Sequence, residues 1–226
     1  MNPILLSLQD CNLFKLKSLE EIDSLLSHIH YSVDTFKENE VVFSPYQIAD
    51  KMGIILSGAV DVQKLFPCGK VVILNRRTAS DLIAEASLFS KTKYYPSTIS
   101  ACTTCQILFI HKDELLKLFL IDEGIMSCFL ESVSNRVLAL NRKIEVLSLT
   151  SIAEKIAYFL LYDHYDDDNS TILLPFSKKA WAEHMNVSRP SLLRELKKLE
   201  IDGLISIDKR VIQIKDFQRL KEILLD

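Results

Sequence analysis

The sequence predicts an α+β protein made of an antiparallel β-barrel of jelly-roll type, a long helix, and a small C-terminal domain of helices and a β-hairpin. Three observations support this prediction. Short apolar runs separated by turn residues fill residues 31–110, a sustained heptad-like pattern occupies residues 122–147, and two short helical patterns precede a hairpin pattern in residues 177–214. We place the domain boundaries at 1–120, 121–149 and 150–226.

Composition and charge give no direct indication of function. The chain has 226 residues, is 48% hydrophobic and carries a formal net charge of −3. The part from Thr150 onward is slightly acidic, with twelve Lys and Arg against thirteen Asp and Glu. Affinity for nucleic acid would therefore have to come from local placement of charge, and would weaken steeply with salt. The sequence has no apolar run of roughly 18 residues and no secretory signal, so we expect a cytoplasmic protein without a membrane segment.

The N-terminal half begins with a helical pattern and continues with short strand patterns. A helix is expected over residues 12–30, and its apolar side consists of Leu13, Leu16, Leu19, Ile22 and Leu26. The clearest strand patterns that follow are 41–43, 53–58, 60–63, 71–74 and 107–110. Short strands at this regular spacing are typical of an antiparallel barrel or jelly roll.

Residues that suggest metal or redox chemistry have simpler interpretations. The five cysteines are scattered, which is typical of reduced thiols. Cys102 and Cys105 form a CxxC between two strand patterns, which we interpret as a hairpin turn. His28 and His30 have no third ligand nearby and are expected on the surface. The acidic run 166–170 lacks the glycine and glutamate of a calcium loop. We expect no metal, no cofactor and no catalytic residues, so the protein is predicted not to be an enzyme.

The helix over residues 122–147 carries one continuous apolar seam. Its members follow a 4-3-4-3-4-3 spacing and are Met126, Leu130, Val133, Val137, Leu140, Ile144 and Leu147. Packing of this helix on its own barrel is one interpretation. A strict a/d seam with polar flanks, such as Asn135 and Arg142, instead favours a partner helix, so we expect a homodimer.

The C-terminal domain contains two short helices joined by a tight turn. Ser177 and Ser188 are placed to cap them, and Pro190 falls in the first turn of the second helix, where a missing N–H is harmless. Asn186 tolerates the left-handed conformation that the turn needs. Gly203 ends the second helix. Its buried stripe is expected to consist of Leu192, Leu193, Leu196 and Leu199.

These elements are typical of a helix-turn-helix with a wing. Residues 204–207 and 211–214 alternate as two strands around a turn that contains Lys209. From Ser177 to Lys198 there are six Lys and Arg against two Glu, a local net charge of +4. A helix of this kind is often only a solvated surface helix, but the turn length and the hairpin favour an element that enters a major groove.

The segment resembles the winged helix of the CRP/FNR family of transcription regulators. The resemblance rests on Ser188-Arg189-x-Ser191-x-x-Arg194-x-Leu196-x-x-Leu199, followed by Gly203-Leu204-Ile205. It implies that Arg189 and Arg194 read base edges. Pro190 stands where the family has a glutamate that reads cytosine, so the operator should differ from the family consensus. The residues predicted to contact DNA are Ser177, Lys178, Lys179, Ser188, Arg189, Pro190, Ser191, Arg194, Lys197 and Lys209.

The N-terminal half resembles the cyclic-nucleotide-binding domain of the same family. The matching segments are Glu40-x-Val42-Phe43, Ile54-Ile-Leu-Ser-Gly58-x-Val60, Asp81-Leu-Ile-x-Glu85 and Leu88-Phe89. Of the residues that would hold a cyclic nucleotide, only Glu85 is present. Tyr95 and Pro96 replace the arginine and hydroxyl that would bind the phosphate, which argues against cyclic AMP. Glu85, Tyr94, Tyr95, Ser97 and Thr98 are candidates to line a pocket for another effector, or to be filled core.

We therefore expect a sequence-specific DNA-binding regulator that is controlled by a signal in the barrel. Its partners would be a palindromic duplex operator, a second copy of the chain and, if it activates transcription, RNA polymerase. The alternative is an effector-binding module whose winged helix contacts protein and not DNA.

Overall fold

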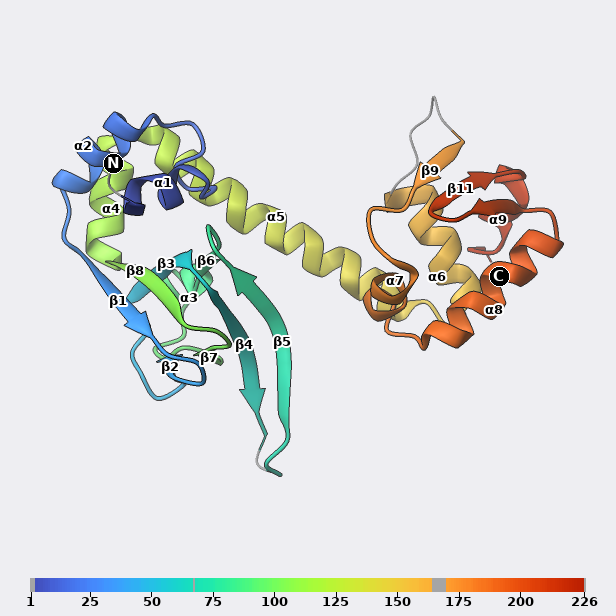
Figure 1. The fold of residues 1–226 in the computed structure, drawn as a ribbon, viewed down its shortest axis with the longest axis horizontal. Coiled ribbons are helices and arrows are strands. Elements are labelled where there is room, and N and C mark those ends of the chain that lie inside the picture. The colour runs from blue at the N-terminus through green and yellow to red at the C-terminus, as the bar shows by residue number, and fades with distance from the viewer. Residues whose placement is uncertain (1–2, 67, 164–169, 226) are drawn as a thin grey trace. The chain divides into compact units, whose positions relative to one another are not determined.

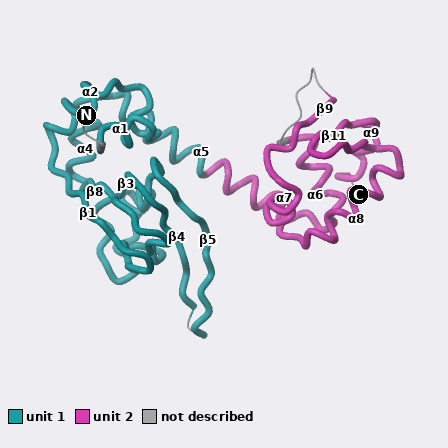
Figure 2. Tube along the Cα trace, viewed as in Figure 1, with its two compact units in different colours: residues 1–136 teal, residues 137–226 magenta. Residues whose placement is uncertain are grey.

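The computed structural model describes residues 3–66, 68–163 and 170–225 (Figure 1). The chain divides into two compact units, residues 1–136 and 137–226 (Figure 2). Helix α5 (Glu123–Ser148) begins in the first unit and ends in the second. In the described part of the chain, no helix is both long and apolar enough to cross a bilayer.

The first unit contains two four-stranded antiparallel sheets, with strand orders β1-β8-β3-β6 and β2-β7-β4-β5. The strands of the first sheet are β1 (Tyr31–Phe36), β3 (Lys51–Ser57), β6 (Leu82–Ile83) and β8 (Cys105–His111). Those of the second sheet are β2 (Val41–Phe43), β4 (Ala59–Leu65), β5 (Val71–Thr78) and β7 (Thr98–Ala101). This arrangement confirms the predicted antiparallel jelly-roll type, with two sheets in place of a closed barrel.

Strand β8 shows why the sheets hold together. Its residues 107–110 are all buried, which accounts for an apolar run without alternation. Successive side chains of a strand point to opposite faces. Ile107 and Phe109 accordingly join the core between the sheets, whereas Leu108 and Ile110 join a second core formed with the helices.

The helices of the first unit are α1 (Pro3–Gln9), α2 (Leu19–Ser27), α3 (Glu85–Leu88) and α4 (Lys112–Ile121). The prediction of one helix over residues 12–30 is wrong, because the helix begins only at Leu19. Ser18 caps it in a capping box, in which the Glu21 N–H donates to Ser18 Oγ and the Ser18 N–H donates to the Glu21 carboxylate. Leu16 lies before this start and is 71% exposed.

The CxxC segment also differs from its prediction. Cys102 directly follows β7 and Cys105 is the first residue of β8. Because these strands belong to different sheets, the segment is a crossing between sheets and not a hairpin turn. Both cysteines have free thiols, and burial raises the pKa of Cys105. Gly58, with φ of +78°, faces this crossing at close range: a Cβ added there would lie 2.3 Å from the Thr104 carbonyl oxygen.

The second unit contains the winged helix. Its helices are α6 (Ile152–Tyr158), continued by a π-helical turn (Phe159–Asp163), then α7 (Lys178–His184), α8 (Arg189–Ile201) and α9 (Phe217–Glu222). Strands β9 (Thr171–Leu173), β10 (Ile205–Asp208) and β11 (Val211–Ile214) form one sheet, with β11 in the centre. The solvated turn predicted at 166–170 lies, up to residue 169, outside the described residues.

The core of the second unit surrounds Trp181, which is fully buried against Phe159. Leu192, Leu196 and Leu199 of α8 join this core as predicted. Leu193 does not, because it lies one position off the i, i+4, i+7 spacing of the other three, and it is 36% exposed. The buried stripe is therefore narrower than the sequence suggested.

Candidate nucleic-acid interface and effector cavity

Two serine caps set the geometry of the helix-turn-helix. Ser177 Oγ accepts a hydrogen bond from the Ala180 N–H at 3.2 Å, and Ser188 Oγ accepts one from the Ser191 N–H, also at 3.2 Å. Between the helices, Asn186 adopts a φ of +53°, a left-handed conformation that asparagine tolerates better than most residues. The turn and both helix starts are therefore encoded locally, as the sequence predicts.

The outward face of α8 carries a short hydrogen-bonded chain of side chains. Ser188 Oγ lies 2.8 Å from Ser191 Oγ, and Arg194 Nη2 donates to Ser191 Oγ at 3.3 Å. Arg189 and Pro190 are exposed at the start of the same helix. Because the leucine stripe is buried in the core, these polar side chains are left free to meet a partner surface.

Lysines gather where α7, α8 and the wing come together. Lys178, Lys197 and Lys209 line a shallow pocket of about 190 Å³. Lys209 lies in the turn between β10 and β11 with a φ of +52°. Glu200 joins helix to wing, because its carboxylate accepts from the Ile207 N–H at 3.2 Å and from Lys197 Nζ at 2.9 Å. The three cations can therefore reach one anionic surface, such as a duplex backbone.

The predicted DNA-contacting residues all belong to one unit, and none is fully buried. Ser191 and Lys178 are half-buried, and the rest are exposed. Lys179 lies 4.0 Å from Glu183 and Lys197 is paired with Glu200, so both lysines have carboxylates close by. Lys178, Arg189, Arg194 and Lys209 form no such ion pair among the described residues. The exposed cations of this set without a carboxylate partner are therefore Arg189 and Arg194 on α8 and Lys209 in the wing turn.

Helix α5 exposes most of its apolar seam. Leu130, Leu140 and Ile144 are 56%, 61% and 64% exposed, values unusual for large apolar side chains on one line of a helix. Met126, Val137 and Leu147 are also exposed, and Val133 packs partly against the core of the first unit. The seam thus lacks a covering partner along most of its length within the described residues.

The first unit contains a cavity of about 180 Å³ at the expected effector position. It is lined by residues of β4, β5, β6, α3, β7, the segment before β7, and α5. Of the predicted pocket residues, Glu85, Tyr95 and Ser97 line it. Tyr94 does not, since it is 45% exposed and pairs with Ile48 in an isolated bridge, and Thr98 lies outside the lining.

Two arginines that sequence reasoning missed also line this cavity, Arg77 of β5 and Arg136 of α5. A cation was expected only at the position of Tyr95. No alignment of short motifs could place Arg136 there, because it lies 41 residues further along the chain (136 − 95). The hydroxyl of Tyr95 forms a hydrogen bond outside the cavity lining: it donates to the Lys51 carbonyl at 2.7 Å. Burial raises the pKa of Tyr95 to about 12.

Glu85 and Arg136 form an ion pair beside the cavity. The Glu85 side chain is 1% exposed, and Arg136 Nη2 also donates to the Leu82 carbonyl at 2.9 Å. Burial, and then repulsion from Arg77, lower the pKa of Arg136 to about 10. Arg136 thus remains cationic at neutral pH and neutralises a carboxylate that would otherwise be buried alone.

A jelly-roll-like domain followed by a helix-turn-helix with a wing defines a two-domain transcription regulator with a DNA-binding domain. The family model for the cyclic nucleotide-binding domain matches residues 33–122, and the model for the Crp-like helix-turn-helix domain matches residues 154–223. Together they cover most of the chain, which belongs to the CRP/FNR family of transcription regulators.

Known relatives agree with this assignment. The chain is 25% identical over 190 residues to the global nitrogen regulator of Nostoc sp., covering 80% of this chain and 84% of that protein. Among solved structures, the Thermus thermophilus catabolite activator protein matches with a TM-score of 0.55 at 18% identity, covering 95% and 98% of the two chains. DNR from Pseudomonas aeruginosa matches with a TM-score of 0.50 at 25% identity, covering 96% of each chain.

Proposed function

We propose that this protein is a homodimeric, sequence-specific DNA-binding regulator whose affinity for its operator is set by a ligand in the barrel. The observation that carries the proposal is the outward face of α8. Its buried side is fixed by Leu192, Leu196 and Leu199, and its polar side presents the Ser188–Ser191–Arg194 chain with Arg189 beside it. A rigid helix with an oriented arginine is suited to reading base edges in a major groove.

The remaining predicted residues have roles that follow from their chemistry. Arg189, Pro190, Ser191 and Arg194 would face base edges. Ser177, Lys178, Lys179, Ser188, Lys197 and Lys209 would hold phosphates. Because Pro190 has no carboxylate, no cytosine amino group is bonded at that position. We therefore expect an operator that differs from the family consensus where the glutamate would read cytosine.

The proposed dimer uses the exposed seam of α5. Burying the exposed apolar side chains of the seam against their copies would remove a continuous apolar line from water, at roughly 25 cal/mol for each Å² buried. A two-fold dimer presents two copies of α8, which match a palindromic operator with half-sites about 34 Å apart. The same helix carries Arg136 at the cavity, so one rigid element would connect the ligand site with the dimer seam.

The DNA part of the proposal is tested by selection from a random duplex pool followed by anisotropy titration. We expect one palindromic motif to be enriched. The charge reversal Arg189→Glu with Arg194→Glu should weaken binding to it at least 100-fold, since a good base contact is worth about 1–3 kcal/mol. The control reverses Lys215 and Lys221, which lie outside the proposed interface, and should stay within a few-fold of wild type.

Two results would contradict the DNA part. A pool that enriches no motif would favour the alternative, a winged helix that docks on protein. Equal affinity of the Arg189→Glu/Arg194→Glu protein and wild type would remove α8 from the interface.

The dimer part is tested by the mass in solution. Leu140→Lys with Ile144→Lys places charge on the seam, where both side chains are exposed within one chain, so folding should be retained. We expect light scattering to change from the mass of two chains to that of one. Asn141→Lys, on the polar flank, is the matched control and should remain dimeric. A wild-type protein that is monomeric at all concentrations would exclude the proposed dimer.

A further inference from the structure

The charge that lines the barrel cavity is unbalanced. Arg77, Arg136 and Glu85 contribute two cations and one anion to the lining. Glu85 is committed to Arg136 by their ion pair. No carboxylate in the described part of the chain pairs with Arg77, although this side chain is only partly exposed. Asp81, which lies outside the lining, attracts Arg136 but forms no ion pair with Arg77. Arg77 is therefore the one charged residue of the lining without an ion-pair partner among the described residues.

We infer that this cavity is a site for a small oxyanion, a carboxylate or a phosphate, held between Arg77 of β5 and Arg136 of α5. The inference deepens the proposed function and rests on it, since it names the class of ligand for the barrel. Guanidinium groups bind carboxylate and phosphate through paired N–H donors, and two of them approaching from different elements can hold one anion from two sides. Ser87, Ser97 and Asn75 line the same cavity and add hydrogen-bonding groups.

The electrostatics of the two arginines support this site. Repulsion from Arg77 is the second cause, after burial, of the lowered pKa of Arg136. An anion bound between the two guanidinium groups would offset both causes, because it replaces lost hydration and screens the repulsion. The protein thus holds two cations close together at a cost that a bound anion would reduce.

The size of the cavity limits the ligand. Its volume of about 180 Å³ corresponds to roughly six water molecules at about 30 Å³ each. This is below the roughly 300–1,000 Å³ of pockets for drug-sized ligands. The apolar part of the lining includes Val62, Leu82 and Ile99, which can accommodate a short hydrocarbon chain. These features favour a small acid or free phosphate over a nucleotide.

Because of the position of Arg136, a bound ligand could affect parts of the molecule outside the cavity. Arg136 holds α5 to the edge of the first sheet through its bond to the Leu82 carbonyl, and it holds α3 through Glu85. An anion in the cavity competes with Glu85 for the same guanidinium. Binding would therefore change the attachment of α5, the helix that carries the proposed dimer seam.

The test is calorimetric titration of the full-length protein at constant ionic strength, with inorganic phosphate in one arm and succinate in the other. We expect saturable binding of at least one probe, and the probe that binds identifies phosphate or carboxylate as the chemistry. Arg77→Gln should weaken it at least tenfold. The paired change Glu85→Gln with Arg136→Gln should do the same without leaving a buried carboxylate unpaired. Lys70→Gln, which removes one charge from the β4–β5 turn outside the lining, should bind within twofold of wild type.

The outcomes separate this inference from the proposed function. If neither probe binds more tightly than chloride, or if Arg77→Gln binds like wild type, the inference fails. Operator binding of the wild-type protein is measured on the same preparation. Intact DNA binding without anion binding would overturn the oxyanion site alone, whereas anion binding that shifts DNA affinity by about 5- to 150-fold would support both.

Discussion

The barrel cavity and the recognition helix both present arginines, but they are assembled in opposite ways. Arg189 and Arg194 come from one helix and are exposed, and Arg194 donates a hydrogen bond to Ser191, three residues away. Arg77 and Arg136 come from separate elements and meet at a cavity where charge is costly. Removing an exposed arginine of α8 should therefore weaken DNA binding with little loss of stability, whereas removing Arg136 should lower the free energy of unfolding.

The largest expected loss of stability comes from a substitution in the barrel. Arg136→Ala would leave the Glu85 carboxylate buried without its cation, which should cost about 3–5 kcal/mol of unfolding free energy. Arg194→Ala, the matched loss of an exposed arginine, should stay within about 0.5 kcal/mol. Urea unfolding followed by circular dichroism measures both variants. The fluorescence of Trp181, the single tryptophan, reports the winged helix separately. Similar losses of unfolding free energy in the two variants would contradict the expected difference between the buried and the exposed arginine.

A second contrast uses two glycines with nearly the same backbone. Gly58 has a φ of +78° and Gly203 a φ of +76°, but an added Cβ at Gly58 meets the Thr104 carbonyl oxygen, whereas at Gly203 it meets nothing within 4 Å. Gly203→Ala should cost only about 1–2 kcal/mol of left-handed strain. Gly58→Ala adds overpacking of about 1–3 kcal/mol. Thermal unfolding should rank the variants in this order, and equal midpoints would show that the sheet crossing relaxes freely.

A smaller effect separates stability from DNA binding within α8. Ser188→Ala removes the N-cap and should cost about 1 kcal/mol, measured by Trp181 fluorescence during urea unfolding. Ser188→Asp restores a capping oxygen, so stability should return close to wild type. Its negative charge faces the proposed duplex surface, however, so DNA affinity should still fall. An aspartate variant with full DNA affinity would place Ser188 outside the phosphate contacts.

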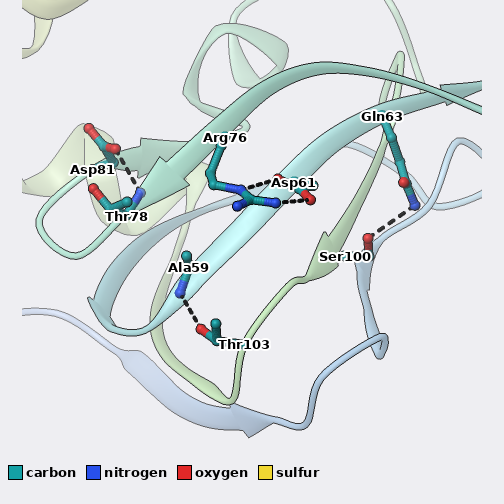
Figure 3. A network of polar contacts seen from close by, with 8 residues as sticks. All are labelled: Ala59, Asp61, Gln63, Arg76, Thr78, Asp81, Ser100 and Thr103. Atoms are coloured by element: carbon teal, nitrogen blue, oxygen red, sulfur yellow. Dashed lines mark hydrogen bonds and ion pairs between the residues drawn. The ribbon is translucent and has the colours of Figure 1, made fainter. Parts of the chain in front are cut away.

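The smallest expected effect comes from Asp61 and Arg76, which join β4 to β5 through two hydrogen bonds of 2.8 and 2.9 Å (Figure 3). Hydrogen bonding to Arg76 lowers the pKa of Asp61 in the folded state. The pair therefore stabilises the fold above the unfolded pKa of about 4, and this contribution is lost as pH falls through the lower folded value. Because Arg76 is largely exposed, the loss should be about 1 kcal/mol or less. Asp61→Asn should remove this part of the acid dependence; an unchanged acid profile would assign it to other carboxylates.

The sequence by itself determined the elements whose signals are local. Ser177 and Ser188 cap their helices, Asn186 and Gly203 adopt left-handed conformations, and the wing strands start within one residue of their predicted positions. Each of these features depends on hydrogen bonds or steric limits within a few residues. The regular spacing of the seam on α5 could be recognised in the sequence for the same reason, since one helix carries all of it.

Only the tertiary structure decided which residues from distant parts of the chain meet in space. The cation of the cavity was sought at Tyr95, yet Arg77 and Arg136 supply it from another strand and from α5. The other two errors had local causes: the capping box of Ser18 and Glu21 starts the helix at Leu19, and Leu193 lies one position off the spacing of the buried leucines. Burial and charge pairing depend on which segments meet in space, and a linear pattern records only the periodicity of each segment by itself.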